Sequence, residues 1–434
     1  MYDTLLKVTE DTRIWEGQRR ATHAFHLSPS VYRITTAQQQ ELTQLGYAIT
    51  DCLQGLSHLA TIAFDRELNY RGVWTELRQI FSSGVPKAYH DLQGQNRTQL
   101  PQLLKVDLMV NEWGEFRIAE IDGHNKHGLG YATLGRLFRQ SLYPEAKALP
   151  GAVKLITDYV RKLGFDTVKI FYADQERFYL PEFEIAQAEF AKLGLHCQVF
   201  SEMEAETALL KEGLFLDLPF LYHRTALYET IIDSYKKGKV VFVIPPKPFL
   251  GAKGVLAILR NDSKDPILEG LLQSFIRAHS LQRVRQYIPE TYLVGTQAVT
   301  WENLPREATM PRYNMVRNVQ RLDMKQYVLK ESISSGMKGT IFSSDPSFES
   351  DLSDACKSQM NWILQEEIIN QPQTFSWFED GSNSAPILQT TEDWYMRVTV
   401  QYVQRQLADI IVTARRDKAV HGAKDCIQLG AVIV

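Results

Sequence analysis

The stretch at residues 105–130 restricts the fold of this chain most, because alternating apolar and polar residues flank a glycine-containing turn. The run LLKVDLMV predicts a strand, NEWGE its turn and FRIAEID the returning strand, so together they predict a β-hairpin. An even number of turn residues places Asp107 and Glu120 on one face, whereas an odd number separates them. Glu120 and Asp122 are two residues apart, so they share a face in either case.

The hairpin therefore gathers three carboxylates, Asp107, Glu120 and Asp122, which repel one another unless a cation or solvent compensates their charge. Because no cysteine or matched histidine accompanies these hard oxygen ligands, the set favours magnesium or calcium over zinc. The alternative interpretation is a polar hairpin at a sheet edge that carries ordinary surface acids.

Composition indicates a chain with a large core and no strong charge imbalance. Its 434 residues, 44% hydrophobic and 23% charged, suffice for two or three domains. A formal charge of -3 and a pI near 6.4 give no electrostatic reason to expect nucleic acid or an anionic membrane as a partner. The four cysteines form no CxxC pair, which favours a reduced compartment. Charged residues follow Met1 closely and no apolar run reaches spanning length, so we expect a cytoplasmic protein.

The predicted elements divide the chain into four parts. Residues 1–100 repeat apolar residues at helix spacing and predict a helical N-terminal region, and residues 101–150 hold the acidic hairpin and a following helix. Strands alternate with helices in residues 151–250, which predicts a small parallel α/β unit. Residues 251–434 add further strands and glycine-containing loops. The fold class is therefore mixed α/β, or α+β.

Two lysines of the last part stand where they could hold phosphates. Lys253 precedes an apolar helix, and Lys330 ends a strand before the loop SISSGMKG, which contains Ser335, Gly336 and Gly339. An ammonium group beside the freed N–H groups of a glycine loop can bind phosphate, although a plain solvated hairpin has the same appearance. No Walker motif occurs, and GLGYATLG lacks one glycine of the dinucleotide fingerprint, so a nucleotide must be held by other means.

Two later strands carry polar residues that suit a nucleotide. WILQEEIINQ predicts a strand that stops in a polar connection, where backbone groups could pair with an adenine edge and an acid with a ribose. That connection comprises Gln365, Glu366, Glu367 and Ile368. Arg397 lies among apolar residues in WYMRVTVQYV, and an arginine in such a strand requires an anionic partner.

The order of these parts resembles the nucleotide-binding half of ATP-grasp enzymes. Because the acidic hairpin comes first, the order is similar to the circularly permuted type, represented by the synthetase domain of glutathionylspermidine synthase. Its pattern R-x-D, turn, E-x-N corresponds to Lys105-Val-Asp107 and Glu120-Ile-Asp122, and the resemblance covers about residues 100–434. The departures are Lys105 for Arg, Asp122 for Asn and a longer segment between the two lysines.

The resemblance implies an ATP-grasp fold with a preceding parallel α/β (pre-ATP-grasp) unit, and ATP and Mg²⁺ as cofactors. The metal ligands would be Asp107, Glu120 and Asp122. The ATP-binding residues would be Lys253, Lys330, Ser335, Gly336, Gly339, Gln365, Glu366, Glu367 and Ile368. Arg397 and Lys330 would act on the reacting phosphate.

The implied activity is that of a carboxylate–amine ligase, which forms an amide through an acylphosphate and releases ADP and phosphate. Its partners would be a small carboxylate and an amine, such as an amino acid, a peptide or a polyamine. Candidate substrate contacts are His124, Asn125, Lys126, His127 and Arg224, which flank the hairpin or end a strand. The alternatives are a non-catalytic ATP-binding regulator, a small-molecule kinase, or a small-molecule binding protein with a fortuitous acidic hairpin.

Overall fold

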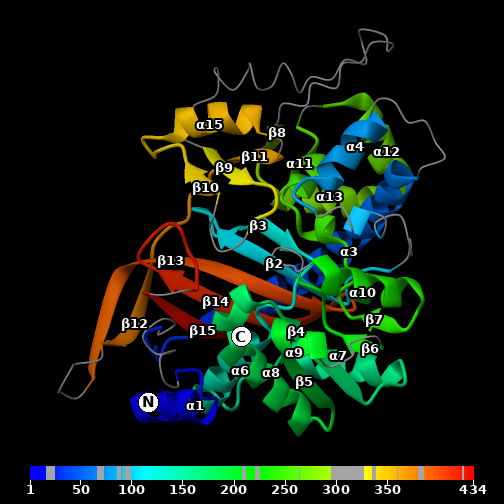
Figure 1. Cartoon of the computed structure of the whole chain (residues 1–434). Helices are drawn as coiled ribbons and strands as arrows, with labels where there is room; N and C mark the ends of the chain where they lie inside the picture. Colours follow the sequence, from blue (N-terminus) through cyan, green and yellow to red (C-terminus); the bar gives the residue numbers. More distant parts are fainter. Residues whose placement is uncertain are drawn as a thin grey trace.

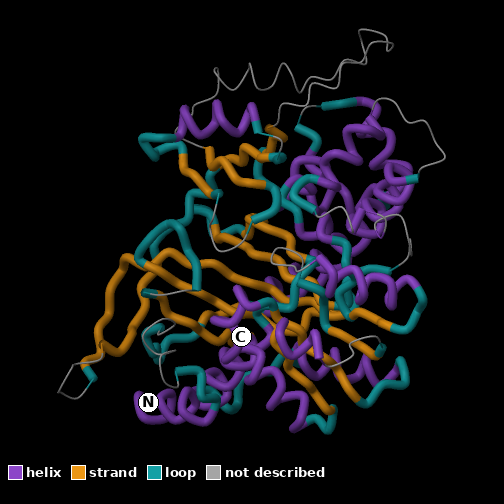
Figure 2. Tube along the Cα trace, viewed as in Figure 1, coloured by secondary structure: helices purple, strands orange, loops and turns teal. Residues whose placement is uncertain are grey.

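The fold is known from a computed structural model, which describes residues 1–15, 25–65, 73–85, 89–90, 92, 99–207, 212–219, 225–262, 264–294, 327–334, 339–358, 360–379, 386–422 and 425–434. Within these ranges the protein has a mixed α/β fold with three sheets. Figures 1 and 2 show the largest sheet in the middle of the molecule, with a smaller sheet and a group of helices above it and an α/β unit below it. None of the described helices is both long enough and apolar enough to cross a membrane.

The acidic hairpin has the predicted strand bounds, with β2 at Leu103–Val110 and β3 at Phe116–Asp122. The turn NEWGE between them has five residues, and an odd turn by itself would pair Asp107 with Ala119. A bulge at Ala119 restores the pairing of Asp107 with Glu120. The prediction that these two carboxylates share a face is therefore confirmed, although the turn is of the length expected to separate them.

The hairpin belongs to a large sheet with the strand order β1-β15-β14-β13-β2-β3, in which β12 also pairs with β13. The remaining strands are β1 at Tyr32–Ile34, β12 at Gln373–Glu379, β13 at Ile387–Val403, β14 at Gln406–Arg415 and β15 at Cys426–Ile433. β1 is parallel to β15, and the other pairs are antiparallel. The hairpin and the last strands of the chain, far apart in sequence, thus lie side by side (Figure 1).

Helices cover both faces of the large sheet. α3, at Thr36–Phe64, begins with a capping box between Thr35 and Gln38, and its apolar residues share a core with β13 and β14. Leu429 of β15 belongs to that core, whereas the next residue, Gly430, faces α6 at Leu129–Leu142. The other helices of this part are α1 at Tyr2–Asp11, α4 at Val73–Ser82, α12 at Pro266–Phe275 and α13 at Ala278–Tyr287.

The predicted parallel sheet with flanking helices is present within residues 151–250. The sheet has the order β5-β4-β6-β7, with all pairs parallel. The strands are β4 at Thr167–Tyr172, β5 at His196–Ser201, β6 at Gly213–Phe215 and β7 at Val240–Phe242. The helices are α7 at Ala152–Lys162, α8 at Leu180–Lys192, α9 at Glu202–Thr207 and α10 at Thr225–Lys236, with a 3₁₀ helix, η1, at Asp174–Tyr179.

A third, antiparallel sheet has the order β10-β9-β11-β8 and carries the lysine strand. Its strands are β8 at Thr291–Val294, β9 at Tyr327–Glu331, β10 at Thr340–Phe342 and β11 at Trp362–Glu366. Its neighbours are α11 at Gly254–Arg260 and α15 at Phe348–Lys357. The 3₁₀ helix η2, at Pro248–Gly251, precedes α11 and contacts β3. The cavity described next lies where this sheet meets the hairpin, the last strands and the α/β unit.

Candidate functional site

A cavity of about 660 Å³ is lined by residues from the acidic hairpin, the sheet β10-β9-β11-β8, the last strands of the large sheet and the α/β unit. Most of the residues singled out in the sequence line it, and they come from segments far apart in the chain. These residues are Asp107, Glu120, Asp122, His124, Asn125, His127, Lys253, Lys330, Gln365, Glu366, Glu367, Ile368 and Arg397. Residues Arg224, Ser335 and Gly336 lie outside the described part of the chain, so their predicted roles stay predictions.

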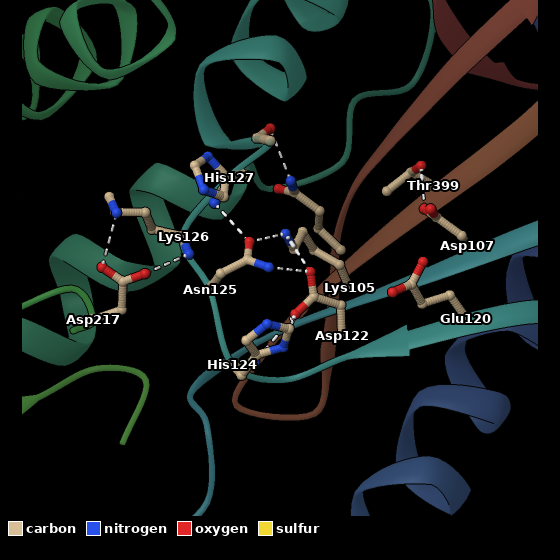
Figure 3. A network of polar contacts seen from close by, with 12 residues as sticks. Lys105, Asp107, Glu120, Asp122, His124, Asn125, Lys126, His127, Asp217 and Thr399 are labelled. Atoms are coloured by element: carbon tan, nitrogen blue, oxygen red, sulfur yellow. Dashed lines mark hydrogen bonds and ion pairs between the residues drawn. The ribbon is translucent and has the colours of Figure 1, made fainter. Parts of the chain in front are cut away.

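Asp107 and Glu120 lie opposite each other on β2 and β3 and face the cavity. Asp107 accepts a hydrogen bond from Thr399 Oγ1 at 2.5 Å (Figure 3). The other carboxylate oxygen of Asp107 lies 3.2 Å from Arg397 Nη1. Glu120 Oε1 lies 3.1 Å from Lys253 Nζ. Each carboxylate therefore has one charged partner that also lines the cavity. Such oxygen ligands fit a hard divalent cation such as Mg²⁺.

Asp122 has different surroundings, although it belongs to the same face. Its carboxylate lies 2.8 Å from Lys105 Nζ and 2.9 Å from His124 Nδ1, and it accepts a hydrogen bond from Asn125 Nδ2 at 2.6 Å. Burial alone would raise the pKa of Asp122, but Lys105 and His124 hold it well below its usual range. Within the described residues, no three His, Cys, Asp or Glu side chains form a group that could hold a metal ion.

The two predicted lysines both line the cavity, and both contact β3 of the hairpin. Lys253 precedes α11, and its Nζ donates to Ser334 O at 3.2 Å. Lys330 Nζ donates to Gln365 Oε1 at 2.6 Å and to the carbonyl of Ala119, the bulge residue, at 3.4 Å. Burial and the nearby charge of Lys253 lower the pKa of Lys330 to about 8. Two ammonium groups so placed favour an anionic ligand between them.

Gln365 and Glu366, which were predicted to follow the strand, are the last two residues of β11, and they line the cavity together with the connection that follows. Gln365 is buried and also donates to Thr291 Oγ1 at 3.1 Å, so its amide is fixed between β8 and Lys330. Glu367 lies 3.4 Å from Lys418 Nζ. Gly339 has a positive φ of 65° and its carbonyl accepts from the N–H of Glu331, but Gly339 is not among the lining residues.

The loop 123–128 connects β3 to α6 and contacts the α/β unit. Lys126 has no exposed side-chain surface, and its Nζ lies 3.3 Å from Glu176 and 3.2 Å from Asp217. Its neighbour His127 places Nε2 2.7 Å from Glu176. Lys126 was predicted as a substrate contact, but burial between two carboxylates gives it a structural role instead. Although burial opposes it, Lys126 and then His127 lower the pKa of Glu176 to about 2.

Sequence reasoning missed several polar residues in or beside the cavity, and Glu176, Asp217, Thr399 and Glu182 are examples. Glu176 and Asp217 follow β4 and β6, at the strand ends where parallel sheets commonly place functional residues, and this signal could have found them. Thr399 lies two residues after Arg397 on one strand, so strand periodicity places both on one face. Glu182 gave no such signal: it is fully buried on α8, accepts from the N–H of Gly128, and its pKa is raised by burial.

Comparison with known proteins adds little to this description. No protein-family model matches the sequence, and no curated protein matches it. Among solved structures, one similar chain is described as "Putative gamma-glutamylcysteine synthetase" from Methylobacillus flagellatus KT. It is 11% identical, with a TM-score of 0.36 over 82% of this chain and 86% of that chain. The described residues form a mixed α/β protein with a cavity that many charged side chains line.

Proposed function

We propose that this protein is an ATP-dependent carboxylate–amine ligase of the ATP-grasp type, with ATP and Mg²⁺ as its cofactors. One observation supports the proposal above all. Two opposed carboxylates, two lysines, an arginine and the polar connection after β11 line the same cavity, although they come from four separate parts of the chain. Phosphoryl transfer needs this combination, because both the nucleotide and the attacking carboxylate are anions.

The residues divide between metal and phosphates by charge. Asp107 and Glu120 would hold Mg²⁺, which when bound supplies charge neutralisation at the transferring phosphoryl group. Lys253 and Lys330 would contact the phosphates. Gln365 accepts a hydrogen bond from Lys330, and the connection after Gln365 would hold the adenine and ribose. In the described structure Arg397 and Lys253 pair with the two carboxylates, so a triphosphate can attract these cations away and leave the carboxylates for the metal.

The proposed reaction has two steps. A substrate carboxylate oxygen forms a bond to the γ-phosphorus as the bond to ADP breaks. The amine nitrogen then forms a bond to the carbonyl carbon, phosphate leaves with the oxygen, and the amine loses a proton. Arg397 and Lys330 would stabilise the charge of the phosphoryl group, and the walls of the partly open cavity would limit attack by water.

A screen for ADP release tests the proposal directly. The full chain would be incubated with ATP, Mg²⁺ and paired carboxylates and amines drawn from amino acids, peptides and polyamines, and the products identified by mass spectrometry. ADP release that needs both substrates and yields an amide supports a ligase. A phosphorylated product without an amide would identify a kinase, and ATP binding without turnover a regulator. Absence of ATP binding would overturn the proposal.

Lys330→Ala is expected to weaken ATP binding about 10- to 100-fold, because a charged hydrogen bond to phosphate contributes about 1.5–3 kcal/mol. Lys330→Arg should lose less, since it keeps the positive charge. Isothermal titration calorimetry would measure both variants. Lys154→Ala, at an exposed lysine of α7, is the matched control. Equal ATP affinity in wild type and Lys330→Ala would remove Lys330 from the phosphate site.

ATP binding is also expected to take up protons at alkaline pH. The pKa of Lys330 is lowered from 10.5 to about 8 without nucleotide, and a nearby phosphate would raise it again. At a pH between the pKa of Lys330 in the free protein, about 8, and its higher pKa in the ATP complex, the complex holds more protons than the free protein. ATP affinity should therefore fall as the pH rises above 8. Calorimetry in buffers of different ionisation enthalpy measures the uptake. Lys330→Arg stays charged, and undiminished uptake in this variant would contradict the assignment.

A further inference from the structure

The three hairpin carboxylates differ in how firmly their present partners hold them. Both oxygens of Asp122 are engaged by its own hairpin and the loop that follows. Oδ1 accepts the N–H of His124 at 3.2 Å and lies 2.9 Å from His124 Nδ1. Oδ2 lies 2.8 Å from Lys105 Nζ and 2.6 Å from Asn125 Nδ2 (Figure 3). No oxygen of Asp122 is left for a cation without breaking one of these contacts.

The partners of Asp122 are themselves fixed. Lys105 is buried, and its Nζ also donates to Asn125 Oδ1 at 2.5 Å. That oxygen in turn accepts the N–H of His127 at 3.0 Å. The imidazole of His124 fills the space beside Gly251, where a Cβ would lie 1.7 Å from Nδ1. Moving Asp122 toward a metal would therefore leave the buried ammonium group of Lys105 without its carboxylate partner and would loosen the loop 123–128.

Asp107 and Glu120 are held by partners that can move. Their charged partners, Arg397 and Lys253, both line the cavity and are the groups expected to contact phosphates. Thr399 can continue to donate to one oxygen of Asp107 while the other oxygen binds a cation. Glu120 is also the most exposed of the three side chains, at 28% compared with 20% for Asp107 and 16% for Asp122.

On the basis of the proposed ATP-dependent function, we propose that Asp107 and Glu120 are the only hairpin carboxylates that bind the divalent cation. Asp122 is a positioning residue, which holds the loop 123–128 at the cavity wall through Lys105, His124 and Asn125. Two carboxylates suffice for Mg²⁺, which commonly takes one or two from the protein and completes its shell with phosphate oxygens and water. Asp122 therefore contributes to the site by placing the loop, and with it His127, at the wall.

Binding of Mn²⁺ in the presence of a non-hydrolysable ATP analogue tests the metal assignment without any substrate. Free Mn²⁺ would be measured by electron paramagnetic resonance with the full chain. Asp107→Asn and Glu120→Gln should each weaken Mn²⁺ binding about tenfold or more, because each removes a charged ligand, whereas Asp122→Asn should stay within about twofold. Asp158→Asn, at an exposed acid of α7, is the control for loss of one negative charge. A loss in Asp122→Asn equal to that in Asp107→Asn would overturn the assignment.

Hydrogen exchange tests the positioning role separately. Asp122→Ala and Asn125→Ala should both speed exchange in the loop 123–128, and Asp107→Asn should not. Asp122→Asn should restore most of the protection, because an amide oxygen can still accept from Lys105. Unchanged loop exchange in Asp122→Ala would overturn the positioning role. If wild type binds the analogue but no Mn²⁺, the metal assignment fails alone, and if it binds neither, the proposed function fails as well.

Discussion

Asp107→Asn is expected to lower ATP-dependent ADP formation about 100-fold or more. A correctly placed divalent cation stabilises the transition state by several kcal/mol, and about 1.4 kcal/mol corresponds to a factor of ten in rate. The substitution keeps the shape of the side chain and its contact with Thr399, but it removes the charge that faces Glu120 across the hairpin. Steady-state kinetics at saturating ATP and substrates would measure the loss.

The same experiment separates a catalytic loss from a folding defect. Asp107 also pairs with Arg397, so the thermal unfolding midpoint of Asp107→Asn must be compared with that of wild type. The midpoints should agree closely, since this pair is partly exposed and such pairs contribute only about 0–1 kcal/mol. Asp158→Asn should keep full activity, because Asp158 lies on the exposed side of α7. Full turnover in Asp107→Asn would exclude the hairpin from the chemistry.

The local sequence predicts the hairpin strands but not the detail that decides their pairing. Alternation of apolar and polar residues sets the bounds of β2 and β3, because one face of each strand packs in the core. The bulge at Ala119 has no such signal in the sequence. It depends on contacts made after folding, including the one from Lys330, which lies 211 residues later and donates to the carbonyl of Ala119. Register therefore required the tertiary structure.

Charge pairing was the other feature that the sequence could not provide. The three acids looked alike in sequence, but their partners come from different distances along the chain. Asp122 is held by Lys105 and Asn125, which belong to the same hairpin and the loop after it. Asp107 is held by Arg397 and by Thr399, and Thr399 lies 292 residues later in the sequence. A cluster of like charges predicts that compensation exists. Only the fold decides whether a metal or a neighbouring cation provides it.

Burial of Lys126 is a further feature that the local sequence does not predict, because the polar run GHNKHG gives no sign that its fourth residue is buried. Its partners Glu176 and Asp217 lie 50 and 91 residues later. Lys126→Met is expected to lower the free energy of unfolding by about 3–5 kcal/mol, because it leaves two buried carboxylates without their cation. Equilibrium unfolding in urea, followed by circular dichroism and fluorescence, would measure the change.

Two further variants test whether buried charge is the cause of that loss. Lys154→Met removes an exposed lysine that pairs with Asp158 four residues later, and it should cost no more than about 0.5 kcal/mol. The triple variant Lys126→Met, Glu176→Gln, Asp217→Asn removes all three charges and should recover much of the stability, since a neutral replacement of a buried ion group is often tolerated. His127 would then lose its charged partner Glu176 and remain as a local cost. A Lys126→Met variant as stable as wild type would show that water reaches this cluster, and that the loop 123–128 is attached to the α/β unit by its other contacts.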